Sequence, residues 1–139
     1  MQPVRTALFA PGTKERVMSK ALESGADAVI LDLEDSVPLA SKEEARTLVA
    51  KTIDAAVAAP SRPGVYVRVN AAGTGLLMDD LNAVTRPGLD AVLLSKAETV
   101  EDVRQCAAAL DRPRHWSRHR PRQWLKTGRR GGGWHGWHD

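Results

Sequence analysis

Four short apolar runs alternate with four segments of helical periodicity, and this alternation limits the possible folds more than any other feature of the chain. The apolar runs cover residues 5–10, 28–33, 64–70 and 89–94. The helical segments cover residues 13–24, 41–53, 77–84 and 99–110. Strands separated by helices pair in parallel, so the order βαβαβαβα predicts an α/β architecture and excludes a β-sandwich or a helix bundle.

The start of the second helical segment carries a capping signal. Ser41 and Glu44 stand three residues apart, the spacing at which two side chains bond backbone amides of the first helical turn. We therefore expect a capping box at Ser41.

Each apolar run ends in polar residues or in a turn. The first run stops at Pro11 and Gly12. The polar residues that follow the other three runs are, in chain order, Asp32, Glu34, Asp35, Arg68, Asn70, Ser95, Lys96 and Glu98. Ligands of parallel α/β proteins bind where the carboxyl ends of the strands meet their loops. We therefore expect these side chains on the rim of one site.

The three acids after the second run have two interpretations. Clustered carboxylates bind hard cations through oxygen, so Asp32, Glu34 and Asp35 could contact a metal, its waters or a substrate. Strand alternation places Asp32 and Glu34 on one face and Asp35 on the other, if the strand extends that far. The alternative is a solvated turn, in which Asp35 or Ser36 bonds backbone amides and caps the next helix.

Two cations accompany these acids. Arg68 lies inside an apolar strand, and its guanidinium matches a carboxylate in two-point contact. We favour a substrate carboxylate as its partner; an internal salt bridge to an acid of the second strand is the alternative, and both can hold at once. For Lys96, a simple electrostatic contact is favoured over a covalent Schiff-base role.

Composition divides the chain near residue 112. Acids outnumber bases up to Asp111, whereas residues 112–139 are strongly basic and contain all four histidines. The single cysteine, Cys106, cannot form an internal disulfide, and no apolar run reaches about 20 residues. The first residues do not resemble a signal peptide, so we expect none. We expect a cytoplasmic protein with no membrane partner.

Four motifs stand out along the chain: LFAPG at 8–12, GADAVILDLEDSVP at 25–38, VRVN at 67–70 and LSKAE at 94–98. Together they resemble the citrate lyase β-subunit-like family of CoA-ester lyases and aldolases. The similarity covers about residues 4–111, which correspond to the N-terminal half of a family domain. The resemblance implies a TIM barrel, here a partial one of about four βα units. It also implies a homo-oligomer and Mg²⁺-dependent cleavage or formation of a carbon–carbon bond in esters such as citryl-CoA or malyl-CoA. Expected ligands are an acyl-CoA and a 2-oxo or hydroxy acid.

The resemblance also assigns roles to residues. Arg68 would contact the substrate carboxylate, and Asp32, Glu34 and Asp35 would surround the metal through its waters. Lys96 matches a family lysine to which no role is assigned beyond an electrostatic contact. The family's direct Mg²⁺ ligands, a glutamate and an aspartate at the ends of strands five and six, lie beyond the similar segment. No direct metal ligand is therefore assigned here, and we expect an inactive fragment of lyase ancestry.

Residues 112–139 show neither a strand nor a helix period, so we expect an irregular tail. Arg, Pro, His, Trp and Gly are the residues that a GC-rich gene yields out of frame, and a frameshift is the favoured explanation. The alternative is a basic arm that binds nucleic acid or a partner. With four strands only, the first and fourth would be exposed edges, and we expect poor solubility.

Overall fold

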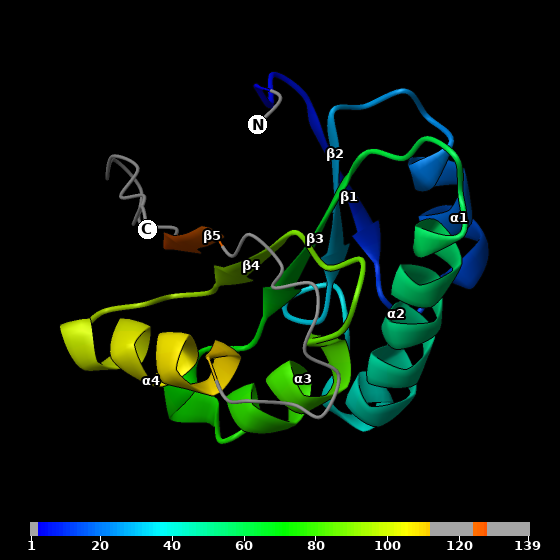
Figure 1. The fold of residues 1–139 in the computed structure, drawn as a ribbon. Helices are drawn as coiled ribbons and strands as arrows, with labels where there is room; N and C mark the ends of the chain where they lie inside the picture. Colours follow the sequence, from blue (N-terminus) through cyan, green and yellow to red (C-terminus); the bar gives the residue numbers. More distant parts are fainter. Residues whose placement is uncertain (1–2, 112–123, 128–139) are drawn as a thin grey trace.

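The computed structural model describes residues 3–111 and 124–127 and confirms the predicted alternation of strands and helices (Figure 1). None of the helices in these residues is long and apolar enough to cross a lipid bilayer. The elements are β1 (Ala7–Pro11), α1 (Glu15–Leu22), β2 (Ala28–Asp32), η1 (Leu39–Ser41), α2 (Lys42–Val57), β3 (Gly64–Val69), η2 (Ala72–Thr74), α3 (Leu77–Val84), β4 (Ala91–Leu94), α4 (Val100–Leu110) and β5 (Trp124–Thr127).

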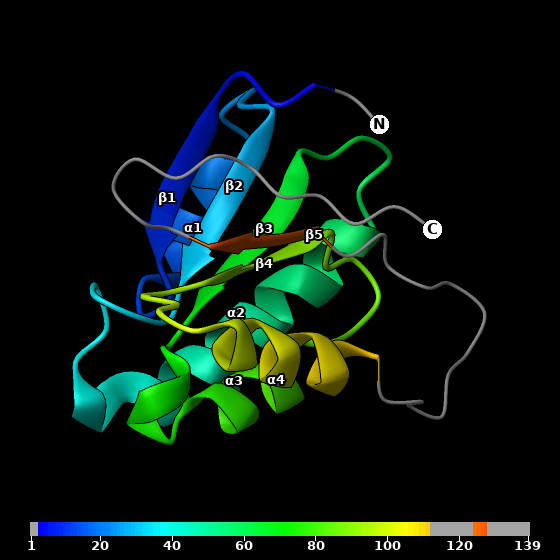
Figure 2. The same ribbon diagram turned by 90° about the vertical axis from the view of Figure 1, so that its left-hand side faces the viewer.

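The strands form one parallel sheet in the order β1-β2-β3-β4-β5. Helices α1 to α4 lie on one side of this sheet in both ribbon views (Figures 1 and 2). The arrowheads of β1, β2 and β3 point to the same edge, so the loops that follow these strands lie together (Figure 1). The register brings Asp32 beside Pro11 on one flank and beside Arg68 on the other.

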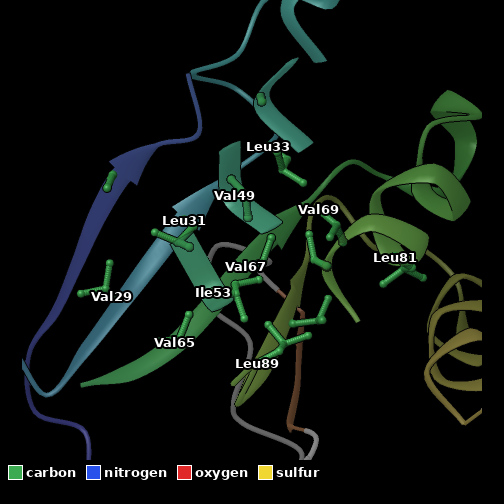
Figure 3. Packing of buried hydrophobic residues seen from close by; sticks show 14 of the residues in the cluster. Val29, Leu31, Leu33, Val49, Ile53, Val65, Val67, Val69, Leu81 and Leu89 are labelled. Carbon is green, nitrogen blue, oxygen red and sulfur yellow. The ribbon is translucent and has the colours of Figure 1, made fainter. Parts of the chain in front are cut away.

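The main core lies between the sheet and the helices. Alternate residues of β2, β3 and β4 point into it, as expected for strands covered on a face by helices (Figure 3). The opposite face carries a smaller cluster of Ala28, Ile30, Tyr66 and Ala91. The residues of the main core labelled in Figure 3 are Val29, Leu31, Leu33, Val49, Ile53, Val65, Val67, Val69, Leu81 and Leu89.

The capping prediction for the second helix is wrong. Ser41 precedes α2, but its side chain makes no capping hydrogen bond. The short helix η1 runs directly into α2, so Ser41 has φ −102° and ψ 1° instead of the extended conformation of a capping residue. The capping box is found at α4, where the Thr99 side chain and the Asp102 side chain bond each other's backbone amides.

A fifth strand corrects the prediction of an entirely irregular tail. Strand β5 lies within residues 112–139 and pairs in parallel with β4, from Ala91 beside Trp124 to Leu94 beside Thr127. The edges of the described sheet are therefore β1 and β5, not β1 and β4. Backbone hydrogen bonds join a short strand to an open edge whatever its side-chain pattern, so four residues give no readable period. The predicted frameshift and nucleic-acid arm otherwise fall outside the described residues.

Two leucines that differ in burial test which residues belong to the core. Leu31 of β2 is fully buried, whereas Leu39 of η1 is 75% exposed. We expect Leu31→Ala to lower the free energy of unfolding by about 3 kcal/mol through lost burial and a residual cavity. Leu39→Ala should change it by no more than about 0.5 kcal/mol. Urea unfolding of both variants measures the difference; equal losses would contradict this core assignment.

Candidate functional site

Asp32, the last residue of β2, is the centre of the candidate site. Its side chain is almost fully buried, and both oxygens accept hydrogen bonds. Arg68 of β3 donates from Nε to Oδ1 (2.7 Å) and from Nη2 to Oδ2 (2.8 Å), which is the two-point contact expected of a guanidinium. The internal salt bridge considered for Arg68 is therefore present, and its contact with a substrate stays a prediction.

The same carboxylate also organises the turn after β2. Oδ1 accepts from the backbone N–H of Glu34 (3.0 Å), and Oδ2 accepts from the backbone N–H (3.0 Å) and the hydroxyl (2.5 Å) of Ser36. The turn is thus held by Asp32, and not by Asp35 or Ser36 acting as the acceptor for a helix cap. Because β2 ends here, an acid of the strand bonds the amides that the sheet leaves unpaired.

The surroundings of Asp32 strongly favour its charged form. Burial by itself raises the pKa of this carboxyl, but the hydrogen bonds from Arg68, Ser36 and the Glu34 amide outweigh it and lower the pKa to about 2. The Asp32 carboxylate in turn raises the pKa of Arg68. The pair is therefore ionised throughout the physiological range.

Glu34 and Asp35 meet a second cation. Lys96 Nζ lies 2.7 Å from Glu34 Oε1 and 3.4 Å from Asp35 Oδ1, while Arg68 Nη1 lies 3.4 Å from Glu34 Oε2. Strand alternation does not separate the acids, because β2 stops at Asp32 and both later acids reach the same ammonium. We call Asp32, Glu34, Asp35, Arg68 and Lys96 the rim cluster; three carboxylates and two cations leave it with one net negative charge.

The position of Lys96 depends on the backbone after β4. Lys96 has φ +48°, a left-handed conformation that is uncommon for a residue with a side chain. Hydrogen bonds with Glu34 and Asp35 raise the pKa of its ammonium. The side chain is 67% exposed, so the same ammonium remains accessible from solvent. The left-handed backbone at Lys96 thus places its accessible ammonium beside Glu34 and Asp35.

Phe9 also belongs to the site, although it was not among the predicted site residues. The Arg68 guanidinium carbon lies 4.8 Å from the centre of the Phe9 ring, a cation–π distance. The register places Phe9 beside Ile30 on the sheet face that carries Arg68, and its side chain is 49% exposed. The signal available in the sequence was its period-two position on the first strand, two residues before Pro11.

Three other polar residues at the strand ends do not join the rim cluster. Asn70 is buried, and its amide donates to Leu33 O (3.0 Å) and Asp80 Oδ2 (2.6 Å). Ser95 is buried, and its hydroxyl has no hydrogen-bond partner among the described residues. Glu98 is exposed in the loop before α4, where its backbone N–H bonds Asp102. Of the predicted rim residues, only the three acids and two cations meet.

The sequence did not predict a buried hydrogen-bond network that lies next to the rim cluster. The Lys42 ammonium donates to Leu33 O (2.7 Å), Glu34 O (2.8 Å) and Asn70 Oδ1 (2.8 Å). Asp80 of α3 is fully buried and accepts from the Asn70 backbone N–H (2.8 Å) and from Arg46 Nε (2.8 Å). In the sequence Lys42 reads as an ordinary solvated lysine of a first helical turn, so no pattern singled it out.

The described residues do not fit a direct Mg²⁺ site. Mg²⁺ requires several oxygen ligands in near-octahedral geometry. Both oxygens of Asp32 are occupied by Arg68 and the turn, and both oxygens of Glu34 lie beside cations. Within residues 3–111 and 124–127, no group of three or more His, Cys, Asp or Glu side chains could hold a metal ion.

The low pKa of Asp32 predicts a pH dependence of stability. An aspartate in an unfolded chain has a pKa of about 3.9, so protons bind the unfolded chain more readily than the folded protein, in which the Asp32 pKa is about 2. This carboxylate should contribute about 2 kcal/mol above about pH 5, and the contribution should disappear as the pH falls toward 2.

Urea unfolding of the parent protein and of Asp32→Asn between about pH 6 and pH 3 measures this contribution. We expect the variant to be less stable at the higher pH and to lose less stability on acidification. An acidic-range slope that Asp32→Asn leaves unchanged would contradict the assignment.

Comparison with known proteins places the chain in a family. The family model "HpcH/HpaI aldolase/citrate lyase" matches residues 5–124. A citrate lyase subunit beta-like protein of Deinococcus radiodurans is 38% identical over 109 residues, 77% of this chain and 38% of the relative. A (3S)-malyl-CoA thioesterase of Cereibacter sphaeroides is 39% identical over 105 residues, 76% of this chain and 36% of the relative. The chain thus spans less than half the length of these relatives.

Solved structures give the same result. The Mycobacterium tuberculosis citrate lyase beta subunit complexed with oxaloacetate and magnesium has a TM-score of 0.60 at 38% identity, covering 73% of this chain and 42% of that one. The protein CitE of the same organism, in complex with magnesium, acetoacetate and coenzyme A, has a TM-score of 0.61 at 35% identity, covering 77% and 38%. The predicted family and its α/β fold are confirmed: this chain belongs to the HpcH/HpaI aldolase/citrate lyase family.

Proposed function

We propose that this chain provides the part of an acyl-CoA lyase site that binds the substrate's carboxylate. The reaction is carbon–carbon bond cleavage or formation in an ester of the citryl-CoA or malyl-CoA type. The observation that carries this proposal is the state of Arg68, which is fixed by Asp32 and Phe9 yet keeps 26% of its side chain exposed at the rim.

The geometry leaves Arg68 able to bind a further anion. Asp32 uses Nε and one N–H of Nη2, so within the described part of the chain the second N–H of Nη2 and the N–H groups of Nη1 remain for other acceptors. Glu34 lies 3.4 Å from Nη1, a distance at which the attraction is mainly between charges. A guanidinium held in place in this way loses little conformational freedom when it binds a carboxylate, because its orientation is already set.

The known ligands of similar structures have the matching chemistry. Oxaloacetate and acetoacetate are carboxylates, and they occur in the Mycobacterium tuberculosis proteins that this chain resembles. A 2-oxo or hydroxy acid and an acyl-CoA are therefore the proposed ligands here. The homo-oligomeric state, the cytoplasmic location and the absence of nucleic-acid binding remain predictions.

Magnesium enters this proposal as the family's cofactor. Similar structures contain it, whereas its direct ligands must lie outside the described residues of this chain. Asp35 is the most exposed acid of the rim cluster, with 65% of its side chain exposed, and is the best placed for a contact through water. We propose that the described residues bind substrate but do not by themselves cleave it.

Titration of the full chain with oxaloacetate, followed by calorimetry in the presence of Mg²⁺, tests the role of Arg68. We expect Arg68→Gln to weaken binding at least about tenfold, because a charge-assisted hydrogen bond contributes about 1.5–3 kcal/mol. Arg68→Lys should also weaken binding, since an ammonium lacks the two-point geometry.

Arg86→Gln is the matched control. Arg86 has a similar exposure, 30% of its side chain, and is also paired with an aspartate, Asp54, but it precedes β4 at the other end of the sheet. It should leave binding unchanged. Equal affinities of the parent protein and Arg68→Gln, with the fold verified by circular dichroism, would contradict the proposed role.

A further inference from the structure

The ammonium of Lys42 donates all of its hydrogen bonds to groups of the protein. Lys42 is the first residue of α2 and is only 8% exposed. Its three N–H donors have three acceptors at 2.7–2.8 Å, namely Leu33 O, Glu34 O and Asn70 Oδ1. Burial lowers the pKa of Lys42, while the charges of Asp80, Asp32 and Glu34 oppose this effect.

Two of these acceptors are the first backbone carbonyls after β2. The strand ends at Asp32, so the carbonyls of Leu33 and Glu34 have no partner within the sheet ladder. Buried carbonyls need hydrogen-bond donors, and Lys42 supplies the shortest one to each. The Asn70 side-chain amide also donates to Leu33 O (3.0 Å), and the Val37 backbone N–H also donates to Glu34 O (3.2 Å). The Leu33 side chain is fully buried in the core, which fixes the other side of the same peptide. The backbone on both sides of the Leu33–Glu34 bond is therefore held.

The third acceptor is itself rigid. Asn70 bonds Asp80 through both its backbone N–H and its side-chain amide, at 2.8 and 2.6 Å. Arg46, one helical turn after Lys42, bonds the other oxygen of Asp80 at 2.8 Å. Through Asn70 and Asp80, Lys42 is thus connected to the end of β3 and to α3. Its position is therefore set by these elements and not only by the loop after β2.

We propose that Lys42 is a positioning residue that holds the Glu34 backbone so that the Glu34 carboxylate stays between Arg68 and Lys96. Glu34 Oε1 lies 2.7 Å from Lys96 Nζ, and Glu34 Oε2 lies 3.4 Å from Arg68 Nη1. A shift of the loop by about an ångström would therefore break this arrangement. The effect of Lys42 on substrate binding rests on the proposed function, whereas its effect on the position of Glu34 does not.

The ammonium of Lys96 reports the position of Glu34 directly. Its pKa is raised by its hydrogen bonds with Glu34 and Asp35, so displacement of Glu34 should lower it. Lysine side-chain NMR of labelled protein measures this pKa without chemical modification. We expect a lower Lys96 pKa in Lys42→Met, whose side chain has similar length but no N–H donors. Oxaloacetate binding should weaken at least about tenfold in the same variant, as small misplacements at a binding site can cost up to about a hundredfold.

Lys51→Met is the control, since Lys51 is an exposed lysine of the same helix that pairs with Glu15. It should change neither readout. Lys42→Gln retains two N–H donors and repeats the measurement if Lys42→Met does not fold. An unchanged Lys96 pKa in a folded Lys42 variant would contradict the proposal, as would loss of the fold in both variants. If Lys96 shifts as expected but the parent protein does not bind oxaloacetate, the proposed function fails and the positioning role stands.

Discussion

The contact between Asp32 and Arg68 is the interaction on which the rest of the site depends. The two residues face each other in the β2–β3 register, at the last position where β2 belongs to the sheet. A buried carboxylate without a cation would be costly, and here both of its oxygens meet the guanidinium. The same carboxylate holds the following turn through Ser36 and the Glu34 amide. One side chain therefore joins two strands and begins the loop that carries the other acids.

The site has two charged layers with different tasks. The upper layer is the rim cluster, in which Arg68 and Lys96 balance most of the charge of three acids while remaining partly accessible. The lower layer consists of Lys42, Asn70 and Asp80, which are buried, and of Arg46, which is partly exposed. Hydrogen bonds within the protein join the four residues, and Arg46 Nη2 is the one buried polar side-chain atom of this layer without a partner among the described residues. Networks of this kind are favourable only when their polar groups are paired, and pairing makes them rigid. The lower layer thus holds in place the backbone that carries the accessible charges of the rim cluster.

The sequence predicted the fold and the rim cluster because both follow from local pattern. Apolar runs separated by helical periods require parallel strands, and parallel strands bring the residues at their carboxyl ends together. The face of Asp35 was not predictable, because alternation holds only while the strand continues, and β2 stops at Asp32. The role of Lys42 was hidden because its acceptors are backbone carbonyls, which every residue carries and no sequence pattern marks. Ser41 failed as a cap because η1 precedes it, and β5 was missed because it is formed by pairing with β4.

A double-mutant cycle on Asp32 and Arg68 tests the central claim most directly. Asp32→Asn, Arg68→Gln and the double variant would be unfolded in urea near neutral pH, and the coupling free energy would be obtained from the four stabilities. A buried two-point ion pair predicts a coupling of about 2 kcal/mol or more. A coupling below about 0.5 kcal/mol, the level of an exposed surface pair, would show that the two residues do not hold the rim together.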